Sequence, residues 1–161
     1  GNINLYAHER VLKSLKKRFD YIFETKDKYP GAPSVNQHII SENTVFKIGS
    51  KKVIPISALH NKLQVFGFRL ATFAYLTDIK TITSDEIDKL KNLDVLVVNA
   101  LRIEPHISHF NLQEALNFIE IVSPTQAYST HISHLLGFHS DVEKSLPINV
   151  KLAYDNLKIS L

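Results

Sequence analysis

A run of seven residues near the middle of the chain, 94–100, limits the fold more than any other segment. It reads Asp-Val-Leu-Val-Val-Asn-Ala, with apolar side chains at consecutive rather than alternating positions. A run of this kind predicts a strand that is buried on both faces of a sheet. A helix pattern at 112–121, with Asn111 as its expected N-cap, and a strand pattern at Gln126–Thr130 follow it. This alternation of strand and helix predicts an α/β fold.

The first part of the chain is expected to be mostly β after one helix. A strand is predicted at Ile3–Ala7 and an amphipathic helix at 8–19, followed by an irregular loop at 26–36 that contains Pro and Gly. Five more strands are predicted from their apolar patterns, at 37–41, 44–48, 52–59, Leu63–Leu70 and 71–77. The other expected elements are a hairpin turn at 49–51, a short helix capped by Ser84, a short helix at 141–146, and a terminal hairpin of 150–154 and 157–161.

The composition is that of one globular domain, residues 1–161. The chain is 44% hydrophobic, and no apolar run approaches the ~18–20 residues of a membrane span. It has no Cys, so a metal ion must be bound by His, Asp or Glu, and this absence fits a cytoplasmic location. The N-terminus shows no signal-peptide pattern. Because the chain also has no Met, we expect it to be truncated.

The formal net charge of +3 is small, and the basic residues concentrate at 13–18 and at Lys51-Lys52. Two interpretations of these clusters stay open: a solvated helix face with a turn, or a patch that binds nucleic acid. The first is favoured, because a nucleic-acid-binding face usually carries a denser basic stripe.

Three potential metal ligands stand where predicted strands end. His60 follows the apolar run 53–59, Asp78 follows 73–77, and His131 follows Gln126–Thr130. Imidazole and carboxylate groups are common ligands of zinc, manganese and iron. Since strand ends can meet at one edge of a sheet, these three residues predict part of a metal site.

Five of the eight histidines fall between His106 and His139, mostly in two pairs near element ends. One pair is His106 with His109, before the helix that Asn111 caps, and the other is His131 with His134. A lone histidine is more often a satisfied surface or core group than a ligand, whereas paired histidines at element ends favour a site. Neither pair has the helical spacing of a zincin motif, so the pattern alone does not specify the chemistry.

Six segments form an ordered set over nearly the whole chain. They are Leu-His-Asn-Lys-Leu at 59–63, Phe-Gly-Phe-Arg-Leu at 66–70, Tyr-Leu-Thr-Asp at 75–78, His-Phe-Asn-Leu-Gln-Glu-Ala-Leu at 109–116, Thr-His-Ile-Ser-His at 130–134, and Ala-Tyr-Asp-Asn-Leu at 153–157. Together they resemble the metallo-β-lactamase-fold hydrolases, and within them the branch that contains the cyclic phosphodiesterase PhnP. The resemblance implies the C-terminal part of an αβ/βα sandwich, a mixed sheet with flanking helices.

The resemblance also implies roles for single residues. His60 would bind one metal ion, Asp78 would bridge two, and His131 would bind the second. His109 would act on the scissile phosphate or the leaving group as a general acid. His134 and, more weakly, His106 would have supporting roles. The implied reaction is hydrolysis by a metal-bound hydroxide at a dinuclear site of zinc, manganese or iron.

The chain departs from the family at one principal point. The His-x-His-x-Asp-His motif, which supplies further ligands to both ions, is absent from the sequence. We therefore expect the chain to supply only part of the site and to bind metal weakly or not at all when alone. A smaller departure is Asn156, where the family usually has Gly; Asn can adopt the same left-handed turn conformation.

Two alternatives to a phosphodiesterase stay open. One is a hydrolase of the same fold that acts on nucleic acid or on a thioester. The other is a non-catalytic binding or oligomerisation module in which the histidines are structural remnants. The expected partners are a small phosphodiester substrate and other copies of the chain, because apolar surface would be left open. Nucleic acid is a weaker expectation, and no membrane partner is expected.

Overall fold

The computed structural model describes residues 2–24, 26 and 28–160, which form two compact units, Gly1–Thr44 and Val45–Leu161. Each unit is described here by itself. The expectation of a single domain over residues 1–161 stays a prediction.

The first unit pairs two parallel strands, β1 (Ile3–Ala7) and β2 (Val35–Ile39), with helix α1 (Glu9–Arg18) and the short 3-10 helix η1 (Asp20–Ile22) between them in sequence. Leu12 is buried on the apolar side of α1, as the helical pattern predicts. Strand β2 begins two residues before the predicted start, since the amide of Ile3 already donates to the carbonyl of Ser34 (2.8 Å).

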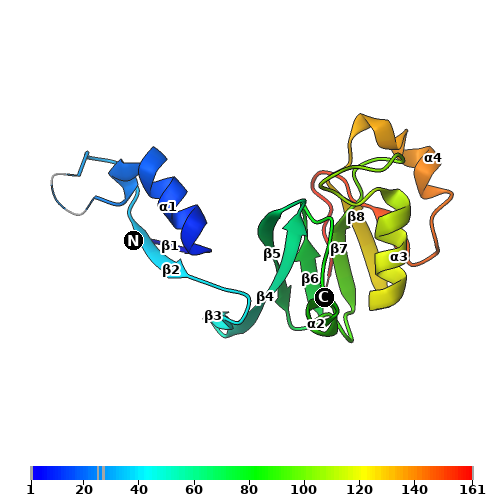
Figure 1. The fold of residues 1–161 in the computed structure, drawn as a ribbon, viewed down its shortest axis with the longest axis horizontal. Coiled ribbons are helices and arrows are strands. Elements are labelled where there is room, and N and C mark those ends of the chain that lie inside the picture. The colour runs from blue at the N-terminus through cyan, green and yellow to red at the C-terminus, as the bar shows by residue number, and fades with distance from the viewer. Residues whose placement is uncertain (1, 25, 27, 161) are drawn as a thin grey trace. The chain divides into compact units, whose positions relative to one another are not determined.

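The second unit is built on a seven-stranded mixed sheet with the strand order β3-β4-β5-β6-β7-β8-β9, as the labels in Figure 1 show. Its strands are β3 (Phe46–Ile48), β4 (Lys51–His60), β5 (Leu63–Leu70), β6 (Phe73–Leu76), β7 (Val95–Asn99), β8 (Gln126–Thr130) and β9 (Val150–Leu152). Strands β3 to β6 pair antiparallel, and β6 to β9 pair parallel. The predicted α/β class with a mixed sheet is confirmed.

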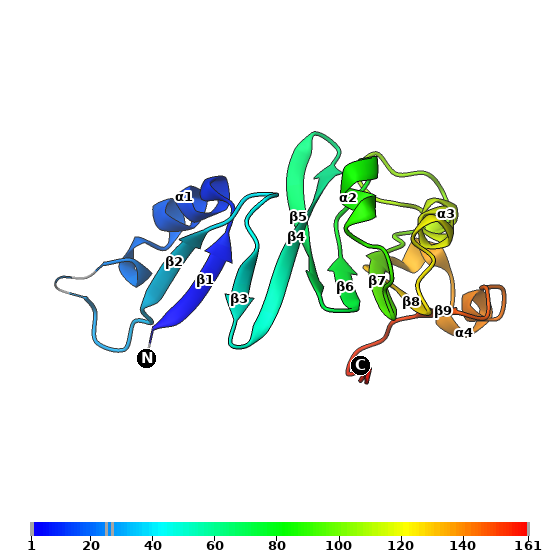
Figure 2. The same cartoon turned by 90° about the horizontal axis from the view of Figure 1, so that it is seen from below.

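Strand β7 lies inside the sheet, and all five of its residues are buried. This confirms the prediction made from the apolar run. Helix α3 (Leu112–Val122) packs over β7 on one face of the sheet, and the two lie side by side in Figures 1 and 2. The core joins Leu96 and Val98 of β7 to Phe118 and Ile119 of α3.

Three short helical segments complete the second unit: α2 (Ser84–Asp88), the 3-10 helix η2 (His134–Leu136) and α4 (His139–Glu143). The N-cap of α2 is Thr83, so the prediction of Ser84 as the cap was wrong by one residue. Helix α4 begins two residues before the predicted start. In the described residues, no helix is both long and apolar enough to cross a membrane.

The predicted terminal hairpin was wrong. Strand β9 pairs parallel with β8, and residues 153–160 form no strand. Position 161 lies outside the described residues. The reason is that β9 ends at Leu152, two residues before the turn at 154–157, so the turn does not carry the chain back along β9. The turn itself forms, because Asn156 adopts φ +68° and the amide of Leu157 donates to the carbonyl of Tyr154 (3.1 Å).

Helix α3 begins with a capping box, which the sequence predicted in part. The Asn111 side chain accepts from the Glu114 amide (2.8 Å), and the Glu114 carboxylate accepts from the Asn111 amide (2.9 Å). The side-chain Nδ2 atom of Asn111 also donates to the carbonyl of Ile103 (3.0 Å). This second bond fixes the loop that precedes the helix.

We expect Asn111→Ala to lower the free energy of unfolding by about 1–2 kcal/mol, because it removes the cap and a bond to the preceding loop. Urea denaturation measures this loss. Gln113→Ala is the matched control, since Gln113 lies exposed in the same turn, and it should change stability by less than about 0.5 kcal/mol. Equal effects of the two substitutions would contradict the assignment of the cap.

Candidate metal centre

The sheet brings the ends of three strands to one edge. Strand β4 is antiparallel to β5 and β5 to β6, so β4 runs in the same direction as the parallel strands β6, β7 and β8. The carboxyl ends of these strands therefore meet at one edge. His60 ends β4, Asp78 follows β6 by two residues, and His131 follows β8.

His109 lies at the centre of this group. Its Nε2 atom is 3.1 Å from Oδ1 of Asp78. Its ring lies edge-on to His60 (centroids 4.6 Å apart) and stacks on His131 (4.8 Å). The Nε2 atom of His131 is 3.5 Å from the same Oδ1 of Asp78. The structure thus places together all four residues that the sequence proposed as ligands or acid.

The burial of these four residues is graded. His109 is 8% exposed, whereas the side chains of Asp78 and His131 are 42% and 40% exposed. One wall of the site is therefore a buried imidazole, and the other groups can reach solvent and a substrate.

The backbone of residues 79–81 anchors three of the four residues. Leu59, next to His60, donates to the carbonyl of Thr81 (2.8 Å) and accepts from the amide of Lys80 (2.8 Å). Phe110, next to His109, donates to the carbonyl of Ile79 (2.9 Å). Asp78 directly precedes this segment. The relative places of His60, Asp78 and His109 are consequently set by hydrogen bonds one residue away from each side chain.

Asp78 and His131 both adopt left-handed backbone conformations, with φ of +58° and +56°. This region is unfavourable for residues other than Gly, although Asp, Asn and His are enriched there. His131 comes one residue and Asp78 two residues after a strand end, where the conformation turns the chain away from the strand direction. Local strain at two adjacent points of one cluster is typical of a functional site.

A second group of contacts involves Nδ1 of His109, the ring nitrogen that does not face Asp78. Nδ1 of His106 accepts from the amide of Ser108 (3.3 Å) and lies 3.1 Å from Nδ1 of His109. Burial lowers the pKa of the His106 imidazole, and the charges of His109 and Arg102 lower it further. With Nδ1 of His106 accepting from Ser108, a hydrogen bond between the two rings would use a proton on Nδ1 of His109, and Oγ of Ser108 lies 3.0 Å from the same atom.

The protonation of the His109 ring determines whether its Nε2 atom presents a lone pair or a proton to Asp78. If His109 is neutral, its Nε2 presents a lone pair to the Asp78 carboxylate, and a cation is needed between them. If His109 is an imidazolium, Nε2 donates a proton to Asp78. The first state is that of a metal ligand and the second that of a proton donor. The arrangement can serve either role.

The donor set fits a divalent transition metal. The nearest ligand atoms of His60, Asp78 and His109 all lie within 4.8 Å of one another, so one ion can reach them with small side-chain adjustments. Two imidazoles and a carboxylate suit zinc, manganese or iron. His106 joins the cluster as a supporting residue through its contact with His109, whereas His134 begins η2.

The sequence did not identify several supporting residues. Asn99, at the end of β7, binds the backbone of Ile79 through its side chain. Arg102 donates to the carbonyls of Glu104 and Pro105 and so fixes the loop before His106. Only the end-of-strand position of Asn99 was visible in the sequence; its partner was not.

Lys80 and Glu114 link the same segment to helix α3 through an ion pair with contacts of 2.6 and 2.8 Å. Partial burial alone would raise the pKa of Glu114, but the bonds from Lys80 and the Asn111 amide, with the charge of Lys80, hold it below its ordinary value. The carboxylate therefore stays ionised and keeps helix α3 fixed to residues 79–81.

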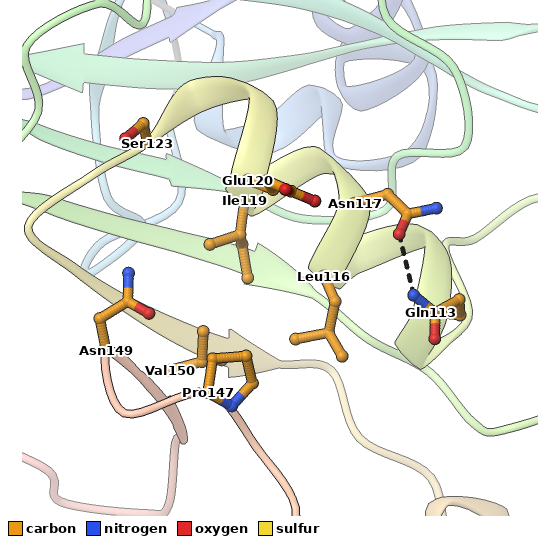
Figure 3. Close-up of a pocket in the computed structure, with 9 residues that line it drawn as sticks. All are labelled: Gln113, Leu116, Asn117, Ile119, Glu120, Ser123, Pro147, Asn149 and Val150. Atoms are coloured by element: carbon orange, nitrogen blue, oxygen red, sulfur yellow. Dashed lines mark hydrogen bonds between the residues drawn. The ribbon is translucent and has the colours of Figure 1, made fainter.

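A hollow of about 500 Å³ lies elsewhere, between helix α3 and the segment before β9 (Figure 3). Leu116, Ile119, Pro147 and Val150 point into it, and polar side chains such as Gln113 and Asn117 lie at its border. None of the histidine cluster lines it. The chemistry of the chain is thus at the sheet edge and not in this hollow.

Comparison with known proteins identifies the family and the fold of the chain. Residues 1–132 match the model of the beta-lactamase superfamily domain. A crystal structure of a diphosphatase from the PhnP family superposes with a TM-score of 0.89 at 31% sequence identity, covering 100% of this chain and 59% of that one. Zinc-bound PqqB from Methylobacterium extorquens shares the fold, with a TM-score of 0.72 at 16% identity over 99% of this chain and 63% of that one.

A curated relative, named as the octanoyltransferase of Porphyromonas gingivalis, is 30% identical over 155 residues, which are 96% of this chain and 31% of that protein. The chain therefore spans about a third of this relative and about three fifths of the diphosphatase. The matches confirm the resemblance on which the sequence analysis relied.

Proposed function

The chain belongs to the beta-lactamase superfamily, with the metallo-β-lactamase fold, and from this premise we propose that it supplies part of a dinuclear metal site in a phosphodiester hydrolase. The main support for the proposal is that potential metal ligands from separate segments of the chain meet at one place. Potential ligand atoms of His60, Asp78 and His109 lie within 4.8 Å of one another, and Nε2 of His131 lies 3.5 Å from the same carboxylate. Of these four residues, His109 is proposed as the proton donor and the other three as ligands. Structural histidines scattered in a core do not require such a meeting point.

Each residue has a defined part in this proposal. His60 would hold one ion, His131 would hold the second, and the Asp78 carboxylate would contribute to both. When bound, such ions supply Lewis acidity toward phosphoryl oxygens and lower the pKa of a water molecule. His109 keeps its Nε2 directed at the reacting region and gives a proton to the leaving oxygen. His106 and Ser108 hold the His109 ring in that orientation.

One solved relative is named a diphosphatase of the PhnP family, which favours phosphate chemistry, and a phosphodiester substrate is part of our proposal. A small phosphodiester fits a site with an exposed carboxylate bridge and one buried proton donor. Zinc, manganese and iron remain equal candidates on donor chemistry. A cytoplasmic location also stays a prediction.

A second candidate is cleavage of an ester or thioester, because one relative is named an octanoyltransferase. The two are separated with the parent protein, meaning the natural protein in which residues 1–161 occur. It is assayed with bis-p-nitrophenyl phosphate and with p-nitrophenyl octanoate, each with zinc or manganese. Turnover of the first alone supports the proposal, turnover of the octanoate alone favours the second candidate, and turnover of neither favours a binding module.

The role of His109 predicts an effect that depends on the leaving group. p-Nitrophenolate leaves without protonation, whereas an alkoxide needs a proton. We expect His109→Gln in the parent protein to lower kcat by about 10²-fold or more for an alkyl phosphodiester and much less for bis-p-nitrophenyl phosphate. Equal losses with both substrates, together with loss of bound zinc, would assign His109 as a ligand instead.

A further inference from the structure

We propose that Asn99 is a positioning residue that fixes Asp78, His109 and His131 relative to one another. The inference rests on the proposed function for its consequence in catalysis, but its geometry is independent of that function. Asn99 is fully buried at the last position of β7, between the strands that lead to Asp78 and to His131.

The side chain of Asn99 extends the sheet beyond the point where its backbone pairing stops. The ladder between β6 and β7 ends at the pair Leu76 and Val98. Beyond it, Oδ1 of Asn99 accepts from the amide of Ile79 (2.9 Å), and Nδ2 donates to the carbonyl of Ile79 (3.1 Å). The carboxamide thus satisfies both polar groups of a buried backbone unit directly after Asp78. Without it, Ile79 would keep an unsatisfied amide in the core.

Hydrogen bonds at Ile79 and next to Asn99 also connect to the neighbours of His109 and His131. The carbonyl of Ile79 accepts from the amide of Phe110 as well, and Phe110 follows His109. Asn99 pairs with Thr130 in the sheet, and the amide of Ala100 donates to the carbonyl of Thr130 (2.9 Å), which precedes His131. Asp78 and His109 are therefore each one residue away from a group bonded to the Asn99 side chain or to Ile79, and His131 is one residue away from the backbone pairing of Asn99 and Ala100 with Thr130.

The chemistry of this position requires a carboxamide. Ile79 offers one donor and one acceptor, and only a side chain with both an acceptor and a donor at this length can satisfy them. Aspartate has the same shape but no donor, so it would face the Ile79 carbonyl with a negative charge. Leucine has a similar volume and neither function. A residue that merely fills the core would be replaced by leucine without moving the histidines.

The test is made on residues 1–161 with Asn99→Asp and Asn99→Leu. Long-range ¹H–¹⁵N spectra of the imidazole groups report the tautomer and the surroundings of each histidine. The matched control is Ser129→Ala, which removes a fully buried hydroxyl from the neighbouring strand β8; in the described residues this hydroxyl has no hydrogen-bond partner. His8 and His38, both in the first unit, serve as internal references.

We expect both Asn99 variants to shift the His109 and His131 resonances, and Ser129→Ala to leave them in place. His8 and His38 should not move in any variant. Site resonances that superpose on those of the unsubstituted chain would overturn the proposal, even if thermal stability falls. Should either variant fail to fold, hydrogen exchange of the unsubstituted chain decides: the Asn99 carboxamide must exchange at least about 100-fold more slowly than that of the exposed Asn117, and equal rates overturn the proposal.

A zinc titration of the parent protein separates this inference from the proposed function. The Asn99 variants should need about tenfold more zinc for half-maximal hydrolysis, as expected for a residue that orients ligands from outside the metal's coordination sphere. If the unsubstituted parent neither binds zinc nor hydrolyses the substrate, the proposed function fails, while the imidazole spectra still decide the role of Asn99.

Discussion

Replacing Asp78 by alanine is expected to lower metal-dependent phosphodiester hydrolysis by the parent protein at least ~100-fold, equivalent to about 2.7 kcal/mol in transition-state free energy. Oδ1 of Asp78 lies near two histidines at once, at 3.1 Å from Nε2 of His109 and 3.5 Å from Nε2 of His131. Its loss removes the charge that offsets the repulsion between two cations. Initial rates with bis-p-nitrophenyl phosphate at saturating zinc or manganese measure the effect.

Asp85→Ala is the matched control for this substitution. Asp85 is an exposed carboxylate in the first turn of α2 and is not one of the four site residues. Its removal should change the rate of hydrolysis by less than about twofold. Full activity of Asp78→Ala would remove Asp78 from the metal site. An equal loss in both variants would point to a general effect of net charge.

The second large effect is expected at Gly67, in the middle of strand β5. A Cβ atom at this position would lie 2.7 Å from Cγ of Leu76 and 2.8 Å from the carbonyl oxygen of Tyr75, both on the neighbouring strand β6. The backbone of a paired strand cannot move aside without breaking the ladder. Gly67→Ala should therefore lower the free energy of unfolding by about 3 kcal/mol, as measured by urea denaturation.

Gly49→Asn provides the comparison. Gly49 has φ +58° in the turn between β3 and β4, and no atom lies within 4 Å of the position of its missing Cβ. Because Asn tolerates this conformation, the change should cost less than about 1 kcal/mol. If Gly67→Ala were as mild as Gly49→Asn, the close approach of β5 and β6 would be wrong.

Local patterns correctly predicted those elements whose burial and capping depend on residues close together in the sequence. The apolar run became β7, and Asn111 caps α3 as expected. The prediction of a terminal hairpin failed because β9 ends at Leu152, before the turn at 154–157. The parallel pairing of β9 with β8 is a contact between distant segments, and no local pattern encodes it. The N-cap of α2 is Thr83 and not the predicted Ser84. Both residue types are favoured at this position, so the sequence does not decide between two neighbours.

For the candidate site, the sequence identified the residues but not the support that holds them. His60, Asp78 and His131 were visible because each stands at the end of a predicted strand. The bond from Asn99 to Ile79, the left-handed turns at Asp78 and His131, and the contact of His106 with His109 depend on which strands become neighbours. These features follow from the tertiary fold, so one sequence alone does not contain a local signal for them.

The zinc content of the purified parent protein tests most directly whether this chain contributes ligands to two metal ions. We expect two zinc ions per chain, about one after His60→Ala or after His131→Ala, and weaker binding by residues 1–161 alone than by the parent. Inductively coupled plasma mass spectrometry after dialysis gives these ratios. Unchanged zinc content in both histidine variants would contradict this expectation.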